Sequence, residues 1–363
     1  MAPLGGLLAG LQLFLDRFMR LRLGLVGLSS DWQHRHFPAL RMLQDRFDVR
    51  GVYSSVSAFS ENVARDFDAQ RFDGFREMLS HDTIDAVMML ESDWYGISPL
   101  VAACDFGKAI YCGSEVDFDP QRAAHLKHLV DGAGVAFMAE FPRRYAPASL
   151  RLKELIATRL GPPQILFCHR RLTCNTADMQ RNRRSLAARA DRELMELIDW
   201  CCFIVGREVR SIQSVYHRAH NAERSFSTGH AGADYQSLSL DLSAPEEPAN
   251  STIAQISCGA YIPPAWQEAI AFRPPAAVQV CCENGLAFVD LPNSLIWFDE
   301  AGRHQESLES EMAVGQQLLT QFHRAVTSLV RKMGDLEDVY RSLRLLQAAR
   351  DSAHSRTAIV LED

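Results

Sequence analysis

Residues 21–32 read LRLGLVGLSSDW, and this stretch decides the fold. Apolar Leu21, Leu23 and Leu25 alternate with small or polar residues up to Gly27, which predicts a buried strand that ends in a tight turn. A strand and turn of this kind open the dinucleotide-binding fold, in which the spacing G-x-G-x-x-G surrounds a pyrophosphate. We therefore expect such a domain to begin near residue 20.

The chain then departs from that glycine spacing. Ser29 stands at the second glycine position and Trp32 at the third. The second glycine lets the backbone approach the pyrophosphate, and the third lets the helix pack on the strand. Serine is a small change, whereas we expect the Trp32 indole to push the helix away or to fill the space of a cofactor. Gly27, Ser29, Ser30 and Trp32 are candidate cofactor-binding residues.

Length and charge limit the possible domain organisation of the chain and the classes of partner it can bind. At 363 residues the chain exceeds a single typical core, which indicates two domains. Its 38 lysine and arginine residues stand against 45 aspartate and glutamate residues, giving a net charge of -7. This balance argues against a nucleic acid as the main partner.

The nine cysteines indicate a protein of the reducing cytoplasm. They include the adjacent pairs 201–202 and 281–282 but no C-x-x-C motif, and no spacing of cysteine and histidine suits zinc. We expect mostly buried, reduced thiols and no metal site.

Residues 1–19 form an N-terminal extension, and its first 18 residues are an apolar run. They lack the basic start and the small-residue cleavage site of a signal peptide, and the run is too short to span a bilayer. Two interpretations stay open: a short docking helix, or a start codon assigned too early, with Met19 as the true start. We expect no transmembrane segment.

Strands and helices alternate through residues 20–140. Helical patterns separate the expected strands, and this alternation predicts a parallel, doubly wound sheet. The strands that follow the first are expected at residues 47–55, 84–90, 109–112 and 135–139.

The pattern changes near Phe141, where a second α/β domain is expected to begin and to extend to residue 363. Its later segments alternate as antiparallel strands do, and helices at residues 194–205, 316–332 and 336–353 accompany them. The last helix is a candidate to pack back on the first domain. The expected strands lie at residues 164–171, 212–217, 236–242, 252–257, 278–282, 287–291 and 294–298.

Several short phrases occur in a characteristic order. They are His36-Phe37-Pro38-Ala39-Leu40, Ile84-Asp85-Ala86-Val87, Gly107-Lys108-Ala109-Ile110, Arg144-Tyr145-Ala146-Pro147, Glu283-Asn284-Gly285-Leu286, Leu336-Glu337-Asp338-Val339 and Ala348-Ala349-Arg350-Asp351-Ser352. From Arg20 onward the chain thereby resembles the Gfo/Idh/MocA family of NAD(P)-dependent oxidoreductases. The resemblance implies an N-terminal Rossmann domain, a C-terminal domain with a large, mostly antiparallel sheet, and a sugar, polyol or related hydroxy compound as substrate.

The positions that carry the family's chemistry are changed. The family has a Glu-Lys-Pro triplet after the fifth strand, and here those positions read Gly113-Ser114-Glu115, so the lysine is absent. A serine hydroxyl cannot supply the charge of an ammonium group. Ser92 stands at the family's proline after the fourth strand. By resemblance, Ser114 is a candidate catalytic residue, and Ser92 and Glu115 are candidate cofactor-binding residues.

The family's D-x-x-x-H helix is also changed. Anchored on Gly206, the resemblance places Arg192 at the aspartate and Glu196 at the histidine that commonly acts as acid or base. The spacing of four keeps both side chains on one helical face. Two interpretations stay open, because an Arg/Glu pair is most simply a salt bridge, while a desolvated Glu196 could act as a general base.

The sequence leaves the choice between NAD and NADP open. Ser54 replaces the acidic residue expected to bind a ribose hydroxyl at the end of the second strand. Serine is compatible with a 2'-phosphate, yet no arginine or lysine follows until Arg65. Ser54 is therefore a candidate cofactor-binding residue for either dinucleotide.

Arginines are concentrated between His169 and Arg192. Arg170, Arg171 and Arg192 are candidates to bind a carboxylate or phosphate of a sugar-like ligand, although a solvated loop or a subunit contact explains them as well. Tyr235, in the loop GHAGADYQ, is a further substrate candidate or simply a loop residue.

Two hypotheses on function follow. The first is an NAD(P)-dependent oxidoreductase in which Ser114, Arg144 and Glu196 replace the usual polar set. Arg144 belongs to the crossover phrase, and a structural ion pair is its alternative role. The second is a non-catalytic ligand-binding regulator, or the inactive partner of an active paralogue. In either case the resemblance implies a homo- or hetero-oligomer formed through the open face of the C-terminal sheet.

Overall fold

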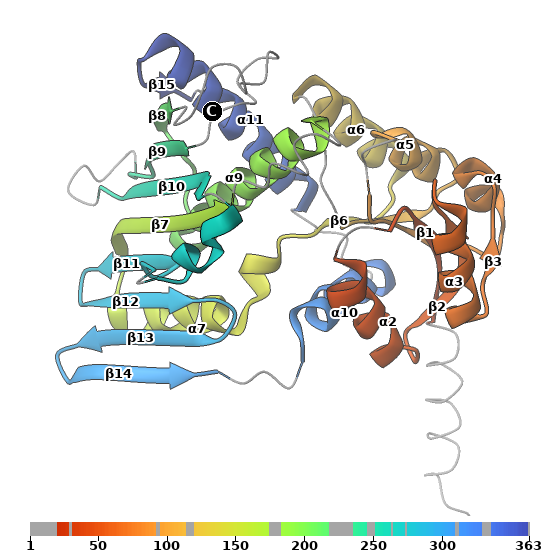
Figure 1. Ribbon diagram of the computed structural model, residues 1–363, viewed down its shortest axis with the longest axis horizontal. Coiled ribbons are helices and arrows are strands. Elements are labelled where there is room, and N and C mark those ends of the chain that lie inside the picture. The colour runs from red at the N-terminus through yellow and green to blue at the C-terminus, as the bar shows by residue number, and fades with distance from the viewer. Residues whose placement is uncertain are drawn as a thin grey trace, which may run out of the picture. The chain divides into compact units, whose positions relative to one another are not determined.

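The computed structural model of the protein divides into two compact units (Figure 1). Unit 1 comprises residues 1–140 and 312–340, and unit 2 comprises residues 141–311 and 341–363. The segment 312–340, expected in the second domain, thus groups with the first. The structure describes residues 20–28, 31–91, 95–113, 120–173, 183–217, 235–244, 251–262, 264–272, 274–308, 312–328 and 335–361.

Unit 1 is built on a six-stranded sheet in the order β3-β2-β1-β4-β5-β6, and all its pairings are parallel. The order reverses direction between β1 and β4, as in dinucleotide-binding folds, so the predicted parallel sheet is confirmed. The strands are β1 (Leu21–Val26), β2 (Phe47–Tyr53), β3 (Gln70–Arg71), β4 (Ala86–Met89), β5 (Ala109–Cys112) and β6 (Phe137–Ala139).

Helices connect these strands, and a helix from late in the chain joins them. That late helix, α10 (Val314–Thr327), packs on the sheet through Phe322, whose ring lies 5.4 Å from that of Tyr111. The other helical segments are η1 (Trp32–His36), α2 (Phe37–Met42), α3 (Ser57–Phe67), α4 (Phe75–Ser80), α5 (Ser98–Asp105) and α6 (Pro120–Ala133).

The first connection contains Trp32, which stands at the position predicted to correspond to the third glycine. The turn that begins at Trp32 is a π-helix, which is wider than an α-helix, and α2 follows it. Only 1% of Trp32 is exposed, and its indole packs edge-on against Phe37 and Phe67, with ring centroids 5.8 and 6.2 Å away. The indole is therefore part of the packing between η1, α2 and α3.

Unit 2 contains a nine-stranded sheet in the order β14-β13-β12-β11-β7-β10-β9-β8-β15. Its pairings are antiparallel except between β7 and β10, so the predicted mostly antiparallel sheet is confirmed. The strands are β7 (Pro163–Thr173), β8 (Ser211–His217), β9 (Tyr235–Asp241), β10 (Ile253–Ile262), β11 (Val278–Cys282), β12 (Gly285–Asp290), β13 (Ser294–Asp299), β14 (Gly302–Ser307) and β15 (Ile359–Val360).

Helices cover one face of this sheet, as Figure 1 shows. Leu152, Ile198 and Leu345 come from three of these helices, and they form one core with Leu166 of β7. The helical segments of the unit are η2 (Pro142–Tyr145), α7 (Pro147–Leu155), η3 (Ile156–Leu160), α9 (Arg183–Val205), η5 (Pro264–Ile270) and α11 (Asp335–Ser355), the last of which begins in unit 1. On β7 the alternate residues Ile165 and Phe167 stay exposed on the opposite face, where no other described residue buries them.

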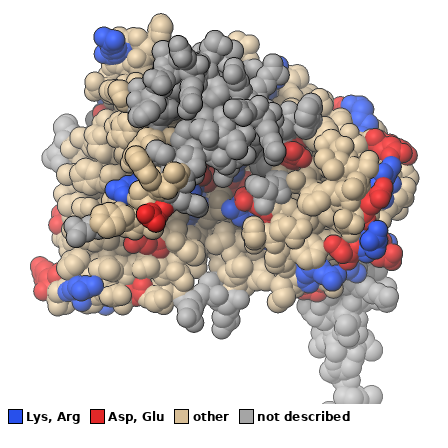
Figure 2. Space-filling model, viewed as in Figure 1, with Lys and Arg blue, Asp and Glu red and all other residues tan. Residues whose placement is uncertain are grey.

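Charged side chains of both signs are interspersed on the face shown in Figure 2. Among the described residues of that face, no extended surface carries one sign alone. The described part of this face therefore carries no continuous basic track that would suit a polyanion.

The turn after β1 depends on Gly27. Its φ of +69° lies in the left-handed region, and a Cβ at this position would lie 2.6 Å from Cβ of Glu91, at the end of the neighbouring strand β4. The variant Gly27→Ala would meet both the unfavourable φ and the close contact with Glu91. Gly107→Ala is the matched control, because Gly107 has a φ of +64° and a Cβ there would meet no atom within 4 Å.

We expect Gly27→Ala to lower the free energy of unfolding by about 1–3 kcal/mol more than Gly107→Ala does, because only the first variant overpacks its site. Urea denaturation of both variants measures the difference. Equal losses would show that the contact with Glu91 does not constrain this turn.

Candidate functional site

The carboxyl edge of the unit 1 sheet collects the ends of its parallel strands. Gly27 follows β1 and Ser54 follows β2, so the structure places both at the edge where such folds bind ligands. Ser29, Ser30, Ser92, Ser114 and Glu115 lie outside the described residues.

Ser54 and its neighbour take part in local contacts at the end of β2. The hydroxyl of Ser54 accepts a hydrogen bond from the Val56 amide at 3.3 Å, and the Ser55 amide donates to the Tyr95 hydroxyl at 2.8 Å. The Tyr95 ring also lies 5.5 Å from that of Tyr53. Burial raises the pKa of Tyr95, so the phenol stays protonated at neutral pH. No pattern along the chain predicts this contact between the segments after β2 and β4.

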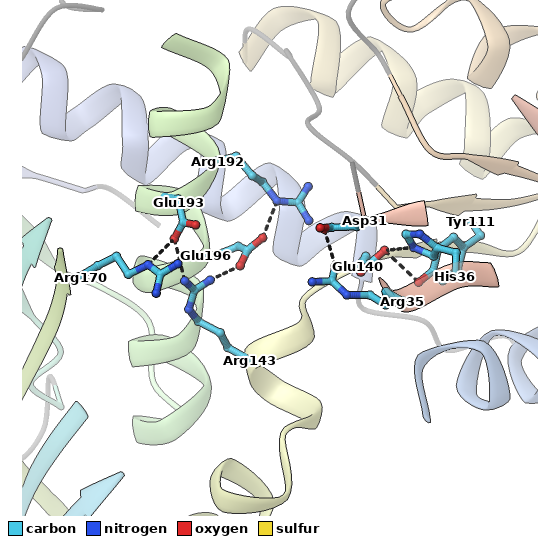
Figure 3. A network of polar contacts seen from close by, with 10 residues as sticks. All are labelled: Asp31, Arg35, His36, Tyr111, Glu140, Arg143, Arg170, Arg192, Glu193 and Glu196. Atoms are coloured by element: carbon cyan, nitrogen blue, oxygen red, sulfur yellow. Dashed lines mark hydrogen bonds and ion pairs between the residues drawn. The ribbon is translucent and has the colours of Figure 1, made fainter. Parts of the chain in front are cut away.

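A buried acid, Glu140, lies at the end of β6 and is absent from the residues predicted for the site. It is 0% exposed, and its carboxylate accepts hydrogen bonds from Arg35, from His36 Nε2 at 2.9 Å and from the Tyr111 hydroxyl at 3.1 Å (Figure 3). Arg35 also pairs with Asp31 at 3.0 Å. The guanidinium neutralises a carboxylate that could not otherwise be buried at low cost.

Glu140 also lies against the backbone at the end of β5. A Cβ on Gly113 would lie 2.9 Å from Oε2 of Glu140, so a larger residue here would require the carboxylate to shift. In sequence, Gly113 stands at the start of the altered triplet, where the family has glutamate. The only sequence signal for this cluster is an acid directly after a buried strand.

In unit 2, guanidinium and carboxylate groups alternate along one chain of contacts (Figure 3). Arg192 Nε donates to Glu196 Oε1 at 2.8 Å, and Arg143 Nη1 donates to Glu196 Oε2. Arg143 Nη2 donates to Glu193 Oε2 at 2.7 Å, and Arg170 Nε lies 3.4 Å from the same oxygen. Helix α9 supplies Arg192 and both glutamates, η2 supplies Arg143, and β7 supplies Arg170.

This arrangement favours the salt-bridge interpretation of Glu196. Each of its carboxylate oxygens accepts a hydrogen bond from a different arginine, and the side chain is only 14% exposed. Taking up a proton would remove the negative charge to which both guanidiniums are bound. A general base at this position would therefore have to break two ion pairs in order to act.

Arg144 is likewise held by a carboxylate. Its Nε donates to Asp199 Oδ2 at 2.7 Å and its Nη2 donates to Asp199 Oδ1, a bidentate pair in which the Asp199 side chain is 1% exposed. The guanidinium also lies 4.8 Å from the ring centre of Phe141. The geometry thus favours the structural ion pair among the two roles considered for Arg144.

The substrate candidates are separated in the structure. Arg170 and Arg171 line one cavity of about 220 Å³, together with Arg143 and His169. Arg192 instead contacts Glu196, as described above. Tyr235 opens strand β9 rather than lying in a loop, and its hydroxyl forms a hydrogen bond with Ser257 Oγ at 3.0 Å.

The part of the chain that the structure describes has neither a metal-binding cluster nor a membrane-spanning helix. There, no group of three or more histidine, cysteine, aspartate or glutamate side chains is placed to hold a metal ion. None of the helices among those residues combines the length and apolar character needed to cross a bilayer.

Burial raises the pKa of the Cys202 and Cys282 thiols to about 12, so both stay protonated.

Residues 21–141 match the oxidoreductase family with an NAD-binding Rossmann fold, the Gfo/Idh/MocA family. The N-terminal domain belongs to this family. The resemblance drawn from the short phrases is thereby confirmed for the part of the chain that carries the dinucleotide-binding fold. A search of curated proteins found no match to the chain.

Solved structures with the same fold extend over both units. An aldose-aldose oxidoreductase from Caulobacter crescentus, in complex with glycerol, has a TM-score of 0.79 at 13% identity, covering 94% of this chain and 100% of that one. A putative myo-inositol dehydrogenase from Sinorhizobium meliloti has a TM-score of 0.72 at 19% identity, with coverage of 94% and 100%. GenD2 from gentamicin A biosynthesis, in complex with NAD, has a TM-score of 0.71 at 18% identity, with coverage of 95% and 97%.

The Glu140 cluster provides a test of how unit 1 is held together. We expect Glu140→Gln to lower the free energy of unfolding by about 3–5 kcal/mol, because it leaves the charge of Arg35 without its buried partner. Glu61→Gln is the control, since Glu61 forms an exposed pair with Arg71 at 3.2 Å and should change stability by less than about 1 kcal/mol. Chemical denaturation measures both variants, and a small loss in Glu140→Gln would contradict the assigned role.

Proposed function

We propose that this chain is a ligand-binding member of the oxidoreductase family that does not use the family's proton-transfer chemistry. The observation that carries the proposal is the occupation of both Glu196 oxygens by Arg143 and Arg192. The bidentate pair between Arg144 and Asp199 supports it, because a second candidate catalytic group is committed to structure. Such a protein would serve as a regulator or as the inactive partner of an active paralogue.

Some features of unit 1 fit a bound dinucleotide, and others do not. The turn at Gly27 keeps the left-handed conformation that the fold's first glycine provides. At the ribose end, however, no carboxylate follows β2, and the Ser54 hydroxyl and Ser55 amide are bonded to Val56 and Tyr95. The left-handed conformation of Gly27 therefore fits NAD or NADP, whereas the ribose end lacks the acid that favours NAD, and we derive no hydride-transfer step.

An NAD(P)-dependent oxidoreductase acting on a sugar, polyol or related hydroxy compound is the second candidate. The match of residues 21–141 to an NAD-binding family favours it, as does the NAD complex of the similar GenD2. In that case Ser114 and Glu115 would replace the missing lysine and its neighbour near the cofactor, and Ser29, Ser30 and Ser92 would complete the cofactor site.

Titration with NADH and NADPH separates the two candidates. We expect neither nucleotide to bind with a dissociation constant below about 100 μM, which corresponds to about 5.5 kcal/mol of association, because the ribose end lacks its acidic partner. Nicotinamide fluorescence and thermal shift measure binding. Tight binding, together with turnover of myo-inositol or glucose in the presence of NAD or NADP, would establish the oxidoreductase instead.

We propose further that a second copy of the chain, or a paralogue, covers the open face of the unit 2 sheet. Ile165, Phe167, Ile253 and Phe298 are apolar side chains left exposed on the strands. An apolar surface of this kind is typical of an interface in a soluble protein.

The buried, reduced thiols Cys168 and Cys258 support a cytoplasmic location.

Light scattering after size-exclusion chromatography tests this surface. We expect the wild-type protein to be a dimer or larger and Phe167→Glu to be shifted to the monomer, because a charge would be buried at the contact. Met42→Glu is the control, since Met42 is an apolar and exposed residue on α2 of unit 1. A monomeric wild type would contradict self-association, and mixing with a paralogue would then test the other partner.

A further inference from the structure

The cavity in unit 2 lies at the end of β7, and most of the charged side chains that line it are basic. Arg143, His169, Arg170 and Arg171 contribute basic or imidazole groups, Trp200 contributes an apolar wall, and Asp290 is the acid among its lining residues. Its volume of about 220 Å³ is below the range of about 300–1,000 Å³ that is typical for drug-sized ligands. The space therefore suits a small molecule.

The guanidiniums of this cavity differ in how firmly they are bound. Arg143 is committed to Glu193 and Glu196, and it is mostly buried. Arg170 is 46% exposed, and within the described part of the chain its ion pair is the 3.4 Å contact to Glu193. Arg171 donates to the Phe272 carbonyl at 3.3 Å, and among the described residues it pairs with no carboxylate. Arg170 and Arg171 thus keep donor groups that can turn to a ligand.

The charges around the cavity do not cancel. Among the residues that line it, Arg143, Arg170 and Arg171 bring three positive charges and Asp290 brings one negative charge, while Glu193 and Glu196 pair with Arg143. Burial, and then the charge of Arg171, lower the pKa of His169, so its imidazole is neutral at pH 7 and does not repel a cation or attract an anion by charge. The excess positive charge therefore lies with the arginines.

The apolar part of the cavity lining is anchored in the core of unit 2. Trp200 is fully buried in the core, and its indole Nε1 donates to Ser149 Oγ at 2.9 Å, which fixes the ring. Leu197, one turn earlier on α9, lines the cavity beside it. A preformed apolar wall facing a few polar donors is the usual composition of a small-molecule site.

We propose that this cavity binds the anionic group of a monosaccharide-sized ligand, a carboxylate or a phosphate. Arg170 and Arg171 supply the direct charge-assisted hydrogen bonds, and Arg143, which Glu193 and Glu196 hold in place, lines the same cavity. The proposal rests on the proposed ligand-binding function and names the class of ligand. It requires no nucleotide and no bond-making step.

Binding of three probes at constant ionic strength tests the site: glucuronate, glucose 6-phosphate and neutral glucose. Isothermal titration calorimetry and thermal shift are performed without nucleotide on the wild type, Arg171→Gln, Arg170→Gln and Arg303→Gln. Arg303 is an exposed arginine on β14 of the same unit, so its variant removes the same charge away from the cavity.

We expect at least one of the two anions to bind saturably and to raise the melting temperature, while glucose does neither. The two probes also tell a carboxylate from a phosphate as the preferred group. Arg171→Gln and Arg170→Gln should each weaken this binding by about tenfold or more, as the loss of a charge-assisted hydrogen bond predicts, and Arg303→Gln should not. Unchanged melting temperatures of the free variants would show that they fold.

The proposal would be overturned if neither anion bound saturably up to about 10 mM, which corresponds to about 2.7 kcal/mol of association. It would also be overturned if glucose bound as tightly as the anions, or if Arg303→Gln weakened binding as much as the cavity variants do. The outcome is distinguishable from that of the nucleotide titration. Anion binding together with dehydrogenase turnover would refute the non-catalytic function and leave the cavity assigned. Absence of both would refute the cavity alone.

Discussion

The pairing of buried carboxylates with arginines is the constraint on which both units depend. Glu140 and Asp199 are 0% and 1% exposed, and each is held by a guanidinium, Arg35 in unit 1 and Arg144 in unit 2. A carboxylate removed from water costs several kcal/mol unless an opposite charge and hydrogen bonds replace its hydration. The arginines beside these buried acids are held in one orientation, and their charge stabilises the fold.

This constraint bears directly on function. The helix face that carries the family's acid or base presents Arg192 and Glu196 here, and the pair is extended by Arg143 into a longer chain of alternating charge. A catalytic group has to exchange a proton, whereas a group in such a chain is stabilised by keeping its charge. Arg143, which is held by Glu193 and Glu196, also lines the cavity of unit 2. The proposed loss of proton transfer and the proposed anion site therefore share one structural element.

The sequence predicted more of the fold than of the site. The alternation of Leu21, Leu23 and Leu25 located β1, and the regular spacing of later strands predicted the parallel sheet, since burial on both faces of a sheet imposes these patterns. The π-helical start at Trp32 and the packing of its indole against Phe67 could not be predicted in this way, because the two residues lie far apart in the sequence. The polar, glycine-rich neighbours of Tyr235 predict a loop, yet pairing with Gly259 places this residue on β9.

The sequence by itself determined the two-domain order and the turn at Gly27, and it predicted the replacement of the family's lysine and histidine, because these are properties of residue type and spacing along the chain. Only the tertiary structure decided what the replacements do. Glu193, Glu196 and Arg143 are brought together from α9 and η2, some fifty residues apart, and no local pattern encodes that contact. The role of a charged residue is set by the charge it meets after folding, and the opposite charge here comes from a different element.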